Sequence, residues 1–164
     1  MRYIFNKKHV FQTWEIEARR FKNLYRVIPH ENLQDVVQTS TLNRIVLDYP
    51  PCMLIWMEAA LQYFRHEQIN IADVTIYTNQ QLPRLKNMPL EKIWDELERK
   101  ETELKQLLKK YTSEELLSDS RNWHWLVWCT FGHYDEHVRQ LEWHFVDKKE
   151  KPPEEKWLNV YIME

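Results

Sequence analysis

The chain has one glycine in 164 residues, and this scarcity limits the folds open to it. β-Sandwiches and barrels need many tight turns, and such turns depend on glycine because it tolerates positive φ angles. Hydrophobic residues make up 43% of the chain and charged residues 29%, so enough apolar material is present for a core without disulfides or structural metal. We therefore expect an all-α protein with a single domain over residues 1–164.

Charge and hydropathy exclude two classes of partner. The formal net charge is −2, and lysines and arginines alternate with acids instead of forming the basic stripe that nucleic acids require. No apolar run approaches the roughly 20 residues that cross a bilayer. Two distant cysteines, Cys52 and Cys129, and an N-terminus without a signal-type apolar region predict a cytoplasmic location with reduced thiols.

Apolar residues recur every three or four positions and predict four helices, over about residues 8–28, 52–64, 89–111 and 123–146. Prolines mark their ends: Pro29 ends the first, Pro50 and Pro51 fit the first turn of the second, and Pro89 opens the third. Asp48 is the expected N-cap of the second helix. Four helices without a repeat imply an antiparallel bundle with one long crossover connection.

The segments between these helices are less regular. Residues 33–46 predict two short helices separated by polar residues at 39–41, and residues 70–83 predict a helical or irregular connection. The letters TSEE at 112–115 form a capping box that starts a short turn. Residues 152–164 predict an arm, strand-like or a short helix, that packs on the bundle.

The stretch TFGHYDEHVRQLEWHF at 130–145 contains the candidate site. In a helix the spacing of His133 and His137 stacks them on one face, roughly 5–6 Å apart at Cβ, so that both imidazoles can hold one ion. Packing histidines reach the same spacing by chance. The one glycine, Gly132, costs about 0.5–1 kcal/mol in a helix, which indicates close approach by another element whether or not it has a chemical role.

Three stretches resemble the DinB/YfiT-like four-helix-bundle superfamily, including its ClbS/DfsB-type members. They are CMLIWMEAALQYF, DVTIYTNQQLPRLKNMPLEKIWDEL and WLVWCTFGHYDEHVRQLEW, within residues 41–143. The resemblance implies a divalent metal, zinc or nickel, held by three histidines, one on the second helix and two at i and i+4 on the fourth. Some members are thiol-dependent transferases or isomerases, and others are resistance or self-protection proteins.

The resemblance places the fourth-helix pair on His133 and His137, but the second-helix histidine is missing. An alignment on Trp56 places Cys52 there, and an alignment on TLNRIVLD places Asp48 there. Either residue can ligate zinc. We predict Cys52, because a residue in the first full turn of a helix points into a bundle more readily than a cap does.

Two functions follow as expectations. The first is a metal-dependent enzyme, related to stress or detoxification, that uses His133, His137 and Cys52 for thiol-dependent transfer or hydrolysis on a small electrophile. The second is a non-catalytic bundle without metal that binds a small molecule or has a protective role. In both, the expected partner is a small molecule or a thiol, and a homodimer is compatible with either function. Neither a nucleic acid nor a membrane is expected as a partner. P-loop, nucleophile-elbow and C-x-x-C motifs do not occur.

Overall fold

The computed structural model describes residues 2–4, 6–39, 43–146 and 160–162. The chain forms two compact units, one of residues 1–49 with 131–164 and the other of residues 50–130. Helices take up most of the described residues, which confirms the all-α expectation in its coarse form. The antiparallel four-helix bundle and the single domain stay predictions.

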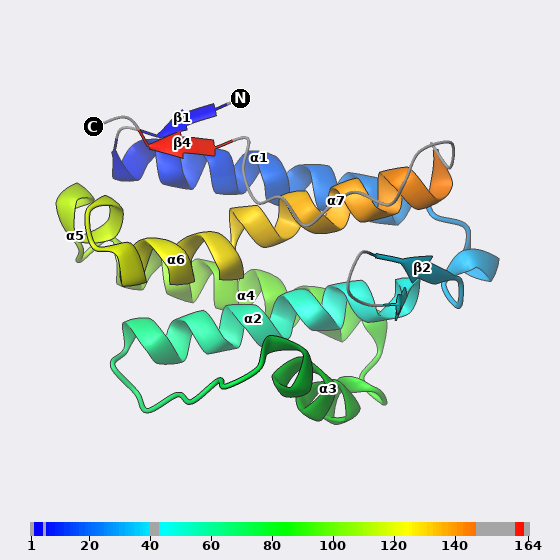
Figure 1. Ribbon diagram of the computed structural model, residues 1–164. Coiled ribbons are helices and arrows are strands. Elements are labelled where there is room, and N and C mark those ends of the chain that lie inside the picture. The colour runs from blue at the N-terminus through cyan, green and yellow to red at the C-terminus, as the bar shows by residue number, and fades with distance from the viewer. Residues whose placement is uncertain (1, 5, 40–42, 147–159, 163–164) are drawn as a thin grey trace. The chain divides into compact units, whose positions relative to one another are not determined.

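The first unit is built on two long helices, α1 and α7, that lie side by side (Figure 1). Its elements are β1 (Arg2–Ile4), α1 (Lys7–Arg26), the 3-10 helix η1 (His30–Asn32), β2 (Val36–Gln38), β3 (Asn43–Ile45), the 3-10 helix η2 (Val46–Asp48), α7 (Phe131–Phe145) and β4 (Val160–Ile162). The first predicted helix is confirmed as α1, which ends three residues before Pro29.

Packing between α1 and α7 combines an aromatic contact with an ion pair. The ring centroids of Phe21 on α1 and Tyr134 on α7 are 5.4 Å apart, and both side chains are fully buried. At the edge of this contact, Nη1 of Arg20 lies 2.6 Å from Glu17 Oε2 and 3.4 Å from Asp135 Oδ1, which links the two helices. The arrangement fixes the face of α7 that turns toward α1.

The prediction of two short helices over residues 33–46 is wrong. The chain there forms an antiparallel hairpin, in which Val36 pairs with Ile45, Val37 with Arg44 and Gln38 with Asn43. Val37 is fully buried, whereas Val36 and Ile45 are exposed, so the pattern is the alternation of a strand. The β-branched residues Val36, Val37 and Ile45 lie on the two sides of this hairpin.

The C-terminal arm is described over three residues. Val160–Ile162 form β4, which pairs in parallel with β1, Arg2 opposite Val160. This confirms the strand-like alternative for those residues. Residues 152–159, 163 and 164 of the predicted arm lie outside the described residues.

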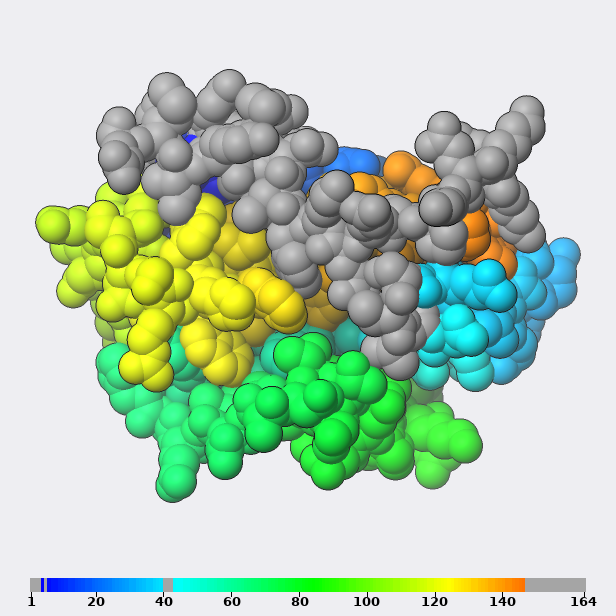
Figure 2. Space-filling view, in the orientation of Figure 1, coloured from blue at the N-terminus to red at the C-terminus, as the bar shows by residue number. Residues whose placement is uncertain are grey.

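The second unit is helical over its described length. It contains most of α2 (Tyr49–Phe64), which starts with the last residue of the first unit, and α3 (Val74–Leu85), α4 (Leu90–Leu108), α5 (Ser113–Leu117) and α6 (Ser120–Cys129). Pro50 and Pro51 lie in the first turn of α2 as predicted. The capping box of Thr112 and Glu115 is also confirmed, and Figure 2 shows α5 and α6 next to each other in yellow-green and yellow.

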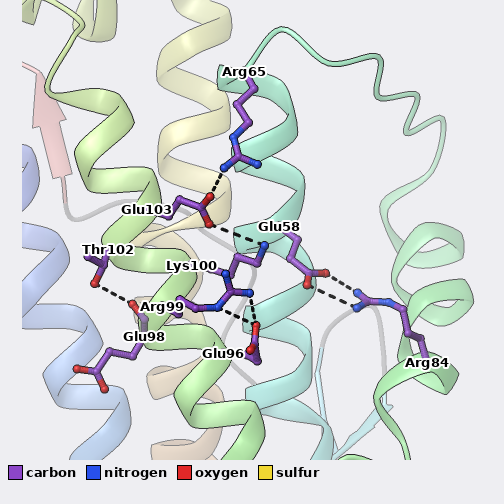
Figure 3. A network of polar contacts seen from close by, with 9 residues as sticks. All are labelled: Glu58, Arg65, Arg84, Glu96, Glu98, Arg99, Lys100, Thr102 and Glu103. Carbon is purple, nitrogen blue, oxygen red and sulfur yellow. Dashed lines mark hydrogen bonds and ion pairs between the residues drawn. The ribbon is translucent and has the colours of Figure 1, made fainter.

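Exposed ion pairs connect the helices of this unit (Figure 3). Arg84 on α3 lies 2.5 Å from Glu58 on α2, and Arg65 on α2 pairs with Glu103 on α4. Such exposed pairs each contribute about 0–1 kcal/mol.

The fourth predicted helix, 123–146, is two helices. α6 ends at Cys129 and α7 begins at Phe131, because Thr130 between them leaves the helical region with φ −127° and ψ −113°. The side chain of Thr130 donates a hydrogen bond to the carbonyl of Leu126. The break coincides with the boundary between the two units. None of the described helices has the length and apolar character that a membrane crossing requires.

Candidate metal centre

His133 and His137 lie one turn apart on α7, and both are buried. Their ring centroids are 4.3 Å apart, and one ring nitrogen of each lies within 4.8 Å of one ring nitrogen of the other. Only 6% of His133 and 2% of His137 are exposed. The structure therefore brings the predicted pair together in a buried position.

A hydrogen-bond chain on α7 fixes the tautomer of His137. The amide nitrogen of Gln140 donates to Glu136 Oε1 over 3.1 Å, so the amide oxygen of Gln140 faces the imidazole. That oxygen can only accept, so Nδ1 of His137, 3.2 Å away, is the protonated nitrogen. The lone pair is therefore on Nε2, which is buried and has no hydrogen-bond partner among the described residues.

Both imidazoles are neutral at neutral pH. Burial, with a smaller effect of the Arg44 charge, lowers the pKa of His133 to about 3. For His137, burial first and then the charges of His133 and Arg44 hold the pKa well below its usual value. A metal ion binds neutral imidazole, so the pair needs no deprotonation before it can act as a ligand.

Aromatic rings surround the pair within the first unit. The ring of Tyr49 meets His137 edge-on at a centroid distance of 4.6 Å, and Phe21 lies 6.1 Å from the same imidazole. Tyr49 and Phe21 are fully buried. They keep water away from the imidazoles, which is the cause of the lowered pKa values.

Of the two candidates for the third ligand, one lies in the first turn of α2 and the other just before that helix. Cys52 is the fourth residue of that helix and only 1% exposed. Cys52, His133 and His137 are all buried, and each offers one ligand atom that a metal ion accepts. Asp48 immediately precedes the helix, and its charge contributes, after burial, to the raised pKa of Tyr25. The choice of Cys52 stays a prediction.

Three neighbours of the pair were not predicted: Tyr49, Gln140 and Arg44. Gln140 follows His137 by three residues on the same helix, so the helical spacing alone was sufficient to find it. Tyr49 and Arg44 come from distant segments, and Arg44 lies in the hairpin that we predicted as helix. No local sequence signal points to them.

The chain was compared with protein-family models, with curated proteins and with solved structures, and none of the three comparisons gave a match. The resemblance to the DinB/YfiT-like superfamily therefore stays a prediction.

Proposed function

We propose that the chain binds one divalent metal ion through His133, His137 and Cys52, and that it is a DinB-like metal-dependent enzyme acting on a small electrophile by thiol-dependent transfer or hydrolysis. The observation that carries the proposal is the pair of buried, neutral imidazoles, one of which has its lone pair fixed on a buried Nε2 atom. A buried acceptor without a partner costs free energy, about 1–3 kcal/mol, and a bound ion would remove that cost.

The hydrogen bond from His137 to Gln140 supports ligation over simple packing. Histidines that bind metals usually donate their second ring N–H to a carboxylate, a carbonyl or water, which orients the ring and makes the ligating nitrogen more basic. Here Gln140 accepts that proton and is itself held by Glu136. The chain Glu136–Gln140–His137 lies on one face of α7 and gives His137 the required orientation.

The case for Cys52 comes from the continuity of α2. Cys52 follows Tyr49 by three residues in the same helix, so the two side chains lie on the same side of it. The ring of Tyr49, the first residue of this helix, packs against His137, and this contact supports the choice of Cys52 as the third ligand. A thiolate with two imidazoles is a donor set that zinc favours, and nickel is the alternative implied by the resemblance.

Three protein ligands would leave room for a water molecule or a thiol at the ion, and zinc or nickel bound there would act as a Lewis acid that lowers the pKa of that group. The protein's own contribution is to hold the ligands and exclude water. Phe21 and Tyr49 shield the imidazoles, and Gln140 keeps the Nδ1 proton of His137 away from the ligating side. Transfer or hydrolysis on a small electrophile is the reaction class that such a site can support.

The rival is a non-catalytic binding or protective bundle in which His133 and His137 only pack. The edge-on contact of His137 with Tyr49 favours this reading, because it is an ordinary core contact.

Thermal unfolding with zinc, with nickel and with a chelator distinguishes a metal-binding protein from a bundle in which the histidines only pack. An ion at roughly 100 times its Kd stabilises the folded form by about 2.7 kcal/mol, which raises Tm on the order of 5–10 °C for a chain of this size.

Two variants and one control sharpen the test. We expect His133→Ala and His137→Ala to abolish the metal-dependent rise in Tm. Both will also lose stability without metal, since the imidazoles are buried, so the quantity to compare is the difference with and without chelator. His144→Ala, on the same helix but hydrogen-bonded to Asp35, should keep the full rise. A parent protein whose Tm responds to neither ion would overturn the proposal.

A further inference from the structure

The first 30 residues of the chain hold a local excess of positive charge. They contain seven lysines and arginines but two glutamates, a net charge of +5, while the whole chain has a net charge of −2. One of the two glutamates, Glu17, is buried and pairs with Arg20, Oε2 to Nη1 over 2.6 Å, so it does not neutralise the rest of the segment. The total charge therefore conceals a basic first helix, α1.

The outward side of α1 takes up about a third of the helix circumference. At about 100° per residue, its exposed residues and the exposed C-cap Val27 fall within an arc of about 120°. This outward arc contains three basic residues, one acidic residue, two aliphatic residues and two amides. The other side chains of α1 are buried or half-buried, so the outward arc is the part of the helix that a partner can reach.

The basic residues of the outward arc are Lys8, Arg19 and Arg26. They are eleven and seven residues apart, which places them within about 20° of one line along the helix. Their side chains make no hydrogen bond or ion pair with any residue that the structure describes. The acidic member, Glu15, lies near the same line and has no ion-pair partner in the described part of the chain either, so the arc has a net charge of +2. These charges stay available to an anionic partner.

Two aliphatic side chains lie beside the basic row. Ile16 is 42% exposed and Val27 74%, and because they are eleven residues apart they share a second line, about 80° round the helix from the first. Neither gains from contact with a nucleic acid, whose interfaces are highly polar. Basic residues next to exposed aliphatic ones are typical of a helix in the headgroup region of a membrane, where cations meet anionic lipids and apolar groups reach the acyl boundary.

We propose that the outward arc of α1 binds an anionic lipid surface, with the helix parallel to the membrane plane. Lys8, Arg19 and Arg26 contact the headgroups, and Ile16 and Val27 enter the boundary with the acyl chains. The 20 residues of α1 extend over about 30 Å, so these side chains face one surface together. The lack of an apolar run that crosses a bilayer concerns a spanning helix and does not bear on surface binding. This binding does not depend on the metal centre.

Sedimentation with lipid vesicles tests the proposal on the full chain, with chelator present so that metal binding does not interfere. We expect the protein to sediment with vesicles of phosphatidylcholine and phosphatidylserine, and to stay in solution with vesicles of phosphatidylcholine alone. Raising the salt concentration should weaken the binding to the anionic vesicles, because the Debye length shortens and exposed charges are screened.

Two substitutions and a matched control assign the binding to α1. Arg19→Gln and Arg26→Gln should each lower the partition coefficient about fivefold, the contribution of one basic residue near an anionic surface. The double variant should lower it roughly 25-fold, because the two positions are about 10 Å apart and act independently. The control combines Lys110→Gln with Arg121→Gln, which removes two exposed positive charges from the second unit and should keep the parent's partition coefficient. All four residues are exposed, so Tm should not change in either double variant.

Val27→Thr distinguishes a lipid surface from other polyanions, since it keeps the shape of the side chain and adds a hydroxyl. We expect this variant to bind anionic vesicles more weakly than the parent does. A parent that does not bind anionic vesicles overturns the proposal, and so does an equal loss of binding in the α1 double variant and the matched control. Heparin binding as tight as vesicle binding, with neither changed by Val27→Thr, would assign the outward arc to polyanions in general and also overturn it.

Discussion

Gln140 decides which nitrogen of His137 is available to a ligand. Replacing it by leucine, Gln140→Leu, keeps the approximate volume but removes the acceptor for the buried Nδ1–H. We expect a loss of stability of about 1–3 kcal/mol from the unsatisfied donor. Zinc affinity should fall roughly 10- to 100-fold, as it does when an outer partner of a ligating histidine is lost. Isothermal titration with zinc and urea unfolding measure the two effects.

The matched control for Gln140→Leu is Glu136→Gln. It keeps an oxygen that can accept from the Gln140 amide and removes only the negative charge. Zinc affinity within a few-fold of the parent is expected for this control. Equal zinc affinity in the parent and Gln140→Leu would show that the hydrogen bond does not orient the ring for ligation.

The lowered pKa values of the two histidines predict how the stability of the metal-free protein depends on pH. The pKa of His133 is about 3 in the folded protein and near 6.5 in an unfolded chain, so below pH 6.5 the unfolded state binds a proton that the folded state excludes. The stabilisation is complete above pH 6.5 and is lost as pH falls toward 3. Each such histidine contributes a slope of about 1.4 kcal/mol per pH unit in that range.

Urea unfolding of the chelated protein between pH 7 and pH 5 measures this slope. His133→Leu removes one of the two groups and should reduce the slope by the contribution of one proton. The comparison with the variant is necessary because other carboxylates and histidines also titrate in this range. An unchanged slope in His133→Leu would mean that His133 is protonated to the same extent in the folded and the unfolded protein.

At the scale of the elements, the sequence was informative wherever a long apolar stripe was present. α1 and α4 begin and end within a few residues of their predicted bounds, because a stripe sustained over five turns leaves little ambiguity and prolines mark the ends. The buried residues of α4 include Ile93, Leu97 and Leu104 of the predicted stripe.

The β2–β3 hairpin shows where pattern reading fails. Each strand is three residues long, too short for alternation to be recognised, and Val36 with Val37 fits a helix face equally well. The alternation becomes visible only through burial, with Val37 inside and Val36 outside. Because Arg44 lies on this hairpin, the same ambiguity hid a residue beside the candidate site.

The break between α6 and α7 gives the glycine a more precise explanation. Gly132 is the second residue of α7, buried, and the structure contains no glycine with positive φ. Backbone conformation therefore does not require glycine at this position. Gly132 is buried, and the close approach of another element stays a prediction.

At the scale of the whole chain, the candidate site combines a local and a non-local part. The spacing of His133 and His137 is local, and it was sufficient to predict that their rings share a face of one helix. Their surroundings come from α1, β3 and the start of α2, which lie more than 80 residues earlier in the chain. Those contacts depend on the tertiary arrangement, so neither Tyr49 nor Arg44 could be assigned before the structure.

The remaining question for the whole chain is whether Cys52 completes the ligand set, and thiol labelling tests it. A thiolate bound to a metal does not react with an alkylating reagent until the ion leaves. Cys52 and Cys129 are both buried, and burial raises the pKa of the Cys129 thiol well above its usual value. Cys129 is therefore an internal control that reacts only when the structure opens.

We expect zinc to slow the labelling of Cys52 by iodoacetamide more strongly than that of Cys129, with chelator restoring the Cys52 rate. Mass spectrometry of the labelled peptides measures both rates in one sample. If zinc slowed the labelling of the two cysteines by the same factor, zinc would protect them only by raising the overall stability of the protein. Local opening at Cys52 would then release no ion, and Cys52 would not be a ligand. If Cys52 reacted equally with zinc and with chelator, it would not be a ligand. The third ligand would then be Asp48, or the ion would rest on His133 and His137 alone.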